Sequence, residues 1–165
     1  MTAPPIKNIA LLADVMEAIS VLARAFTEEW EPYYGARGPG DATGDLTACC
    51  NREDIPLALV ALDDKAQVLG TAALKPDPIE THRHLGPWLA ALLVLPGHRG
   101  MGVGTALVTA IEDEARRLQY GAIYTATRKS SRLITGWDLV DDGVPTLREP
   151  TTIFRRNLPR HPDEQ

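Results

Sequence analysis

The sequence predicts an α+β (mixed α/β) fold in one domain. Three observations lead to this prediction: a length of 165 residues, several short apolar runs typical of strands, and two longer stretches with helical periodicity. The expected order along the chain is β-α-α-β-β-β-α-β-α-β-β. We expect residues 1–165 to form a single domain, with a core from about residue 6 to residue 158 and a frayed C-terminal tail.

The N-terminal part is predicted to contain one strand and two helices. Residues 6–12 are predicted to form a short strand. Asp14 is a candidate N-cap for a helix that continues to about Trp30, because apolar residues recur there at helical spacing. Residues 31–40 contain Pro and Gly at several positions and are predicted to form a loop. A second short helix is expected over residues 45–51.

Three strands are predicted in the middle of the chain. Residues 57–62 and 67–74 are apolar runs separated by a short segment with Asp and Lys, which is typical of an antiparallel hairpin. Residues 75–86 are polar and contain proline, as expected of a loop. Residues 87–95 are almost wholly apolar, which predicts a strand buried on both faces in the middle of a sheet.

The C-terminal part begins with the longest predicted helix, over residues 105–118, which has apolar side chains along one face. Residues 122–127 are predicted to form a strand, and residues 129–135 a marginal helix. Residues 137–140 and 151–157 are expected to form a closing pair of strands.

Composition excludes several classes of protein. The chain has 17 basic and 22 acidic residues, a net charge of −5, which argues against a general nucleic-acid or anionic-membrane binder. The longest apolar run, residues 88–95, is far shorter than the roughly 20 residues of a spanning helix, and no secretory signal is recognisable. Cys49 and Cys50 are adjacent and have no zinc-binding spacing, so reduced thiols, no metal and a cytoplasmic location are expected.

The most informative segment is a glycine-rich turn directly before the longest helix. Gly100, Gly102 and Gly104 alternate there, so the backbone can curl and direct several N–H groups toward one anion. The start of the helix adds unpaired N–H groups, and Arg99 stands beside the turn. A diphosphate suits this arrangement. The turn lacks the third glycine position of the dinucleotide fingerprint and the lysine of the nucleotide-triphosphate loop.

The run Arg99-Gly100-Met101-Gly102-Val103-Gly104 resembles the pyrophosphate-binding loop, Gln/Arg-x-x-Gly-x-Gly/Ala, of the GNAT superfamily of acyl-CoA-dependent N-acetyltransferases. Val94-Leu95-Pro96 is similar to that family's V-x-P, and Gly136-Trp137 to its glycine-aromatic pair. The order of elements is similar over about residues 6–158. The resemblance implies a GNAT-like, mostly antiparallel central sheet with splayed middle strands, flanked by helices.

The same resemblance implies how acetyl-CoA binds as co-substrate. The pantetheine arm would lie between strands 89–95 and 122–127 and pair with the main chain. An N–H of β-strand residue Val94 or its neighbour would polarise the thioester carbonyl. The residues implied in cofactor binding are Leu93, Val94, Leu95, Arg99, Gly100, Met101, Gly102, Val103, Gly104 and Thr105.

One catalytic position departs from the family pattern. Many GNAT enzymes have a proton-donating tyrosine four residues before the glycine of the glycine-aromatic pair, and this chain has Arg132 there. Arg132 can stabilise a departing thiolate by its charge, but a guanidinium is a poor proton donor. The alternative is an exposed cap that touches the cofactor's phosphates. Tyr124 is a second candidate acid, or a packing residue.

The acceptor side is predicted from the end of the first helix. Glu29 is a candidate general base, and Trp30, Tyr33 and Tyr34 would form an aromatic rim suited to a cationic amine. In the alternative interpretation Glu29 is a solvated helix end and Trp30 belongs to the core. Trp88 is expected either to form a wall of the acceptor site or to pack against the first helix.

The predicted function is the transfer of an acetyl group from acetyl-CoA to the primary amine of a small molecule, by direct attack in a ternary complex. One alternative is a catalytically weak acyl-CoA sensor of the same fold, because the tyrosine is absent. Another is a protein N-terminal or lysyl acetyltransferase. No nucleic-acid or membrane partner is expected, whereas a homodimer is compatible with the strand edges near the C-terminus.

Overall fold

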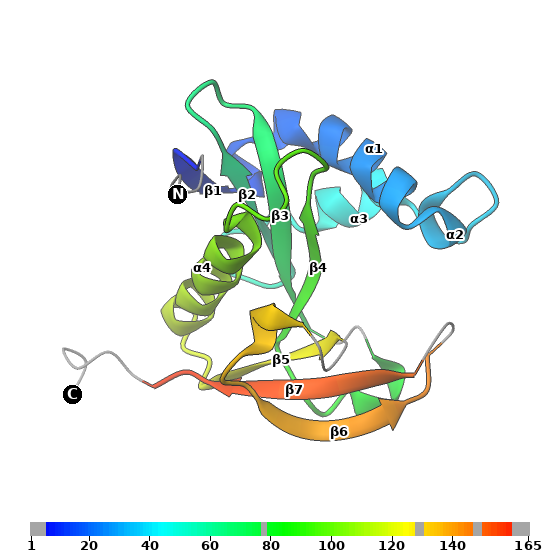
Figure 1. Cartoon of the computed structure of the whole chain (residues 1–165), viewed down its shortest axis with the longest axis vertical. Helices are drawn as coiled ribbons and strands as arrows, with labels where there is room; N and C mark the ends of the chain where they lie inside the picture. Colours follow the sequence, from blue (N-terminus) through cyan, green and yellow to red (C-terminus); the bar gives the residue numbers. More distant parts are fainter. Residues whose placement is uncertain (1–5, 77–78, 128–130, 147–149, 160–165) are drawn as a thin grey trace.

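The computed structural model describes residues 6–76, 79–127, 131–146 and 150–159, which form one seven-stranded sheet with helices on both faces (Figure 1). The strand order is β1-β2-β3-β4-β5-β7-β6, and every neighbouring pair except β4–β5 is antiparallel. The predicted mixed, mostly antiparallel fold is therefore confirmed. The strands are β1 (Asn8–Leu11), β2 (Leu57–Leu62), β3 (Val68–Lys75), β4 (Trp88–Val94), β5 (Ala122–Thr127), β6 (Asp138–Val144) and β7 (Thr151–Asn157).

Two layers of helix cover the sheet. Helices α1 (Ile19–Glu29) and α3 (Ala42–Ala48) pack on one face, and α4 (Val103–Arg117) packs on the opposite face (Figure 1). A short helix, α2 (Glu31–Tyr34), follows α1. The remaining helical turns are of the 3-10 type: η1 (Leu12–Asp14), η2 (Met16–Ala18), η3 (Glu80–His82) and η4 (Arg132–Ile134). None of the helices in the described ranges is long and apolar enough to cross a membrane.

Strand β2 shows how the two layers are built, because all six of its side chains are buried. Leu57, Leu59 and Ala61 pack in the cluster beneath α4, whereas Ala58, Val60 and Leu62 pack in the cluster beneath α1 and α3. This division follows from the alternation of side chains across a strand. A strand covered on both faces needs apolar residues at every position, and this explains the unbroken apolar run.

The N-terminal part differs from the prediction in four places. Asp14 caps no helix; it lies in η1 and its carboxylate pairs with Arg52, and α1 begins only at Ile19. The predicted loop 31–40 contains α2, since a proline is tolerated in the first turn of a helix. The second helix begins earlier than predicted because Asp41 accepts a hydrogen bond from the Gly44 N–H at 3.0 Å.

The predictions for the rest of the chain hold to within a few residues for most elements. The bounds of β2, β5 and β7 are as predicted, and α4 begins two residues earlier than expected. Only η4 falls in the predicted helix 129–135, of which residues 129 and 130 lie outside the described ranges. The prediction that strand 87–95 is buried on both faces is wrong in its middle, where Ala90, Ala91 and Leu92 are only half-buried.

Candidate active site

The half-buried part of β4 lies where this strand separates from β5. The two strands have one registered pair, Trp88 with Tyr124, and the Tyr124 N–H donates to the Pro87 carbonyl at 3.0 Å. The Thr125 hydroxyl donates to the Leu89 carbonyl at 3.0 Å. Past this point β4 continues along β3 while β5 turns away with β7 and β6 (Figure 1). The splayed middle strands implied by the resemblance are therefore present.

A β-bulge interrupts β4 in the separated part. Thr71 of β3 pairs with Leu93 and Ala73 pairs with Ala90, so Ala91 and Leu92 together lie opposite one β3 residue. Ala91 has a φ of +51°, a left-handed conformation that costs a residue with a Cβ roughly 1–2 kcal/mol. The bulge interrupts the regular hydrogen bonding of β4 with β3. It lies in the part of β4 whose other edge is left uncovered by β5.

The glycine-rich turn connects the end of β4 to α4. Gly100 and Gly102 have φ values of +78° and +85°, which favour glycine, and Gly102 is the residue that precedes the helix. The first helical hydrogen bond runs from the Ala106 N–H to the Gly102 carbonyl at 3.1 Å. The amides of Val103, Gly104 and Thr105 therefore precede the first helical bond and are directed out of the helix start. These amides and the positive end of a 15-residue helix form a site that suits a diphosphate.

Arg99 joins this turn to two neighbouring elements. Its Nε–H donates to the Val94 carbonyl at 2.9 Å, and a terminal N–H donates to the Glu29 carboxylate at 3.0 Å. Glu29, the predicted base, thus lies at the end of α1 beside the glycine turn and in an ion pair. Both side chains are 40–50% exposed, so the pair contributes at most about 1 kcal/mol.

Arg132 lies on η4, which packs over the start of α4. The Ser131 hydroxyl accepts a hydrogen bond from the Leu133 N–H at 3.3 Å, and Leu133 contacts the first turn of α4, where a Cβ on Gly104 would lie 3.6 Å from it. Arg132 itself is exposed. The turn that carries Arg132 therefore packs against the first turn of α4.

Trp88 and Tyr124 lie at the closed end of the splay. Trp88 is fully buried, its indole N–H donates to the Leu85 carbonyl at 2.9 Å, and its ring centroid is 5.6 Å from that of Tyr124. Of the two interpretations given above, a wall of the acceptor site is a poor fit, because Trp88 presents no surface to a ligand. It is a core residue, packed against Tyr124 rather than against α1. Tyr124 is half-buried, and the Arg155 guanidinium lies 6.0 Å from its ring centroid.

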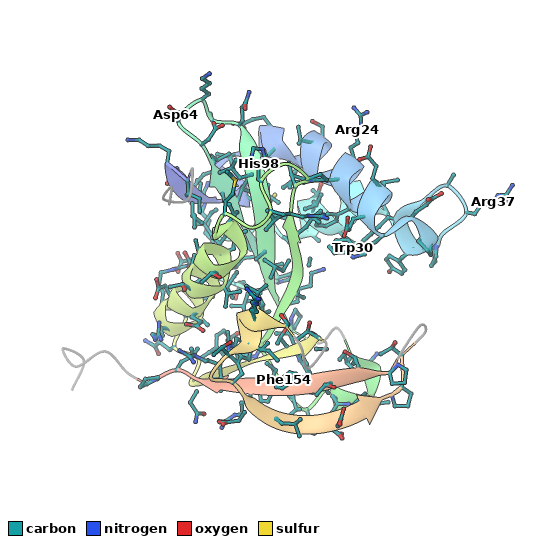
Figure 2. All side chains as sticks on the ribbon, in the orientation of Figure 1. Arg24, Trp30, Arg37, Asp64, His98 and Phe154 are labelled. Carbon is teal, nitrogen blue, oxygen red and sulfur yellow. The ribbon has the colours of Figure 1, made fainter. Side chains whose placement is uncertain are left out.

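The other predicted aromatic residues gather at the end of α1. The ring centroids of Trp30 and Phe26 are 4.9 Å apart, and those of Tyr33 and Tyr34 are 4.7 Å apart. Trp30 and Tyr34 are half-buried, whereas Tyr33 is exposed; Figure 2 shows Trp30 at the junction of α1 with the neighbouring elements. Trp30 therefore packs on the core through Phe26, and the rim of the acceptor site stays a prediction.

A cavity of about 10 Å³, room for a single water molecule, lies on that face, below the bulge. Its lining includes side chains from α1, α3, β3 and β4: Phe26, Asp45, Cys49, Thr71, Lys75 and Ala91. The Tyr34 hydroxyl donates to the Asp45 carboxylate at 2.7 Å. Burial and this hydrogen bond raise the pKa of Tyr34 well above its ordinary value. Sequence analysis did not identify Asp45, because no motif surrounds it and only the packing of α3 brings it to the cavity.

No metal centre is present within the described ranges, which contain no group of three His, Cys, Asp or Glu side chains arranged around one point. The His82 ring does contact the Asp141 carboxylate at 3.0 Å and lies 5.9 Å from the ring of His84. These residues connect η3 to β6.

Several solved structures are similar to this chain. An aminoglycoside 6'-N-acetyltransferase from Enterococcus faecium has 16% identity and a TM-score of 0.70, with 94% of this chain and 99% of that chain covered. The yncA protein of Salmonella typhimurium, assigned as an acetyltransferase and solved with its cofactor acetyl-CoA, has 17% identity, a TM-score of 0.65 and coverages of 94% and 95%. A ribosomal-protein-alanine N-acetyltransferase from Brucella melitensis has 20% identity, a TM-score of 0.68 and coverages of 92% and 99%. At these identities the likeness shows the fold.

The family follows from the sequence itself. No curated protein matches the chain in sequence, but the family model described as the acetyltransferase (GNAT) family matches residues 18–133, more than half of the chain. The matched range includes α1, the cavity, the bulge of β4 and the whole glycine turn. The resemblance seen in the sequence is thus confirmed, and the chain belongs to the acetyltransferase (GNAT) family of enzymes.

Proposed function

We propose that this protein transfers an acetyl group from acetyl-CoA to the primary amine of a small molecule by direct attack in a ternary complex. The observation that carries the proposal is the opening between β4 and β5, which has the glycine turn and α4 on one face and α1 and α3 on the other. Two ligands that approach from opposite faces can meet at the bulge of β4. We also propose a cytoplasmic location, which the two free cysteines support.

The residues at the opening fit acetyl-CoA. The amides of residues 100–105 and the Arg99 guanidinium would hold the diphosphate, since successive N–H groups and a cation form an anion site. The main chain of Leu93, Val94 and Leu95 lies on the edge of β4 that β5 leaves uncovered, and would pair with the pantetheine amides. Bound there, acetyl-CoA supplies the activated acetyl group.

In the proposed reaction the amine nitrogen attacks the thioester carbonyl carbon, the C–S bond breaks, and CoA leaves as a thiolate. The amine loses one proton and the thiolate gains one, so overall no other reactant is needed. Most of the acceleration would come from positioning the two ligands. A main-chain N–H of β4 near Val94 would stabilise the negative charge on the carbonyl oxygen.

Three side chains are proposed to act in this step. Arg132 on η4 would offset the charge of the phosphates or of the thiolate, and Tyr124, at the closed end of the splay, is the other candidate proton donor. Glu29 would accept the amine proton only after release from Arg99, and the diphosphate of acetyl-CoA competes for that same guanidinium. Binding of acetyl-CoA would therefore release Glu29 from Arg99, so that Glu29 could accept the proton of the amine.

A small acceptor is supported by the aromatic residues at the end of α1, which suit a cationic amine. The sensor alternative has one specific observation in its favour, namely that an arginine stands at the position where many family members have a proton-donating tyrosine.

The test combines two assays on the wild-type protein. Titration calorimetry with acetyl-CoA should show one binding site, and NAD and ATP should bind far more weakly. Release of free CoA should then be measured for a panel of small primary amines and for peptides with a free N-terminus. Binding of acetyl-CoA without any amine-dependent release would support the sensor, and acetylation of peptides alone would overturn the small-molecule acceptor.

A further inference from the structure

The parallel pairing of β4 with β5 stops where the opening between them begins. One pair is registered, Trp88 with Tyr124, and the next pair of a continued ladder, Ala90 with Ala126, is absent from the register. In such a ladder the bond that follows Tyr124 would run from the Ala126 N–H to the Leu89 carbonyl, because bonded residues alternate along a strand. Leu89 therefore carries the main-chain carbonyl at which the ladder ends.

A side chain of β5, that of Thr125, donates a hydrogen bond to this carbonyl. Its hydroxyl lies 3.0 Å from the Leu89 oxygen, and both residues are buried. A buried hydroxyl costs free energy unless it is hydrogen-bonded, so packing alone would favour valine, which has the same branched shape, at this position. The bond across the two strands is thus the feature that distinguishes threonine from valine here.

The end of this ladder faces the far end of the cofactor. The diphosphate would bind at the glycine turn, which follows the C-terminal end of β4, so the pantetheine arm would run back along β4 with the acetyl group toward the bulge. Leu89 precedes Ala91 of the bulge by about 7 Å at the usual rise of a strand. One further pair in the ladder would therefore move the closed end of the opening up to the bulge.

We propose that Thr125 is a positioning residue that sets the depth of the opening for the acetyl end of acetyl-CoA. Its hydroxyl takes the place of the Ala126 N–H at the Leu89 carbonyl, so that the strands separate at this residue. This inference rests on the part of the proposed function that puts acetyl-CoA between β4 and β5. Without the hydroxyl the Leu89 carbonyl would lack this donor, and the Ala126 N–H is the next donor along the ladder. The ladder would then extend and narrow the space for the acetyl group.

The experiment replaces Thr125 by valine, which keeps the branched shape, and by serine, which keeps the hydroxyl. Binding of acetyl-CoA and of CoA is measured by calorimetry on the full chain of each variant. Thr125→Val should weaken acetyl-CoA binding about tenfold, or about 1.4 kcal/mol, and CoA binding only about twofold, because CoA has no acetyl group at the closed end. Thr125→Ser should stay within about twofold of the wild type for both ligands, since the donor to Leu89 is kept.

Hydrogen exchange of single amides, followed by NMR, measures the ladder itself. The Ala126 amide should exchange faster than the Tyr124 amide in the wild type, and it should become more protected in Thr125→Val. Thr152→Val is the matched control, because Thr152 is also buried and its hydroxyl links β7 to Asp142 of β6 at 2.9 Å. The control should leave the ratio of acetyl-CoA to CoA affinity and the exchange of Ala126 unchanged.

Three results would overturn the inference: an equal loss for both ligands in Thr125→Val, a loss of the same size in Thr125→Ser, or a wild-type Ala126 amide as protected as that of Tyr124. If Thr125→Val does not fold, Thr125→Ala, whose side chain fits the same space, is judged by the same criteria. A wild type that binds no acetyl-CoA would instead overturn the proposed function.

Discussion

Replacement of Gly102 by aspartate tests the glycine turn as the diphosphate site. Gly102 has a φ of +85° and precedes the first residue of α4, so its substituent lies beside the unpaired amides of the helix start. A side chain in this conformation costs roughly 1–2 kcal/mol. A carboxylate near the positive end of a helix recovers about 0.3–1 kcal/mol of that. The free energy of unfolding should therefore fall by no more than about 2 kcal/mol.

The effect on binding should be larger than the effect on folding. The added carboxylate occupies the amides that the diphosphate needs and repels the phosphates by its charge. We expect Gly102→Asp to weaken acetyl-CoA binding at least tenfold, that is by 1.4 kcal/mol or more. Gly102→Asn is the matched control, because its side chain has the same size and the same strain but no charge. It should lose markedly less affinity than Gly102→Asp.

Titration calorimetry at low and moderate salt provides the assay, with circular dichroism and thermal unfolding to show that both variants fold. The difference between Gly102→Asp and Gly102→Asn should shrink as salt is added, since part of it is charge repulsion. Wild-type affinity in Gly102→Asp would refute the reasoning and would mean that the diphosphate binds elsewhere.

Four further outcomes are expected. Acetyl-CoA at 100 times its Kd should raise the free energy of unfolding by about 2.7 kcal/mol, and equal thermal shifts with NAD or ATP would contradict a specific site. Arg132→Ala should lower turnover or affinity by about 1 kcal/mol and Arg132→Tyr should restore it; identical rates in a CoA-release assay would exclude a role for η4. Glu29→Gln should tighten acetyl-CoA binding a few-fold, because Arg99 is no longer shared with a carboxylate, and weaker binding in a titration would speak against that competition. Burial and the hydrogen bond to Asp45 raise the pKa of Tyr34. The contribution of Tyr34 to the free energy of unfolding should therefore be fully present below the ordinary tyrosine pKa of about 10, and it should fall as the pH rises above that value. Chemical denaturation across this pH range should show a smaller fall in the free energy of unfolding for Tyr34→Phe than for the wild type. An identical fall in both proteins would contradict a raised pKa at Tyr34.

Local features of this protein were predictable because their causes lie within a few residues. The bounds of β2, β5 and β7 follow from unbroken or alternating apolar residues, and the glycine turn follows from residues that tolerate a positive φ directly before a helix. The N-terminal bounds were predicted less well. Asp14 and Asp41 are both acceptable N-cap residues, but only Asp41 caps a helix, since the Asp14 carboxylate pairs with Arg52 from a distant part of the chain.

The residue chemistry of the acceptor side depends on the packing of distant elements. Trp88 has the same apolar neighbours in sequence whether it lines a site or fills a core, and only the closed end of the β4–β5 splay buries it. Glu29 and Arg99 are 70 residues apart in sequence, and Tyr34 and Asp45 belong to two different helices. Such pairs form only in the folded protein, where these separate segments of the chain meet.

The sequence by itself therefore determined the family and the cofactor turn, since a run of glycines at set spacing imposes its own backbone conformation and needs no distant partner. The cavity below the bulge was decided only by the tertiary structure. Asp45 lines this cavity because α3 packs on the face of β3 and β4 that carries the bulge, with one carboxylate oxygen held by Tyr34. The physical reason is that a side chain's exposure, charge environment and hydrogen-bond partners depend on long-range packing, which local spacing does not encode.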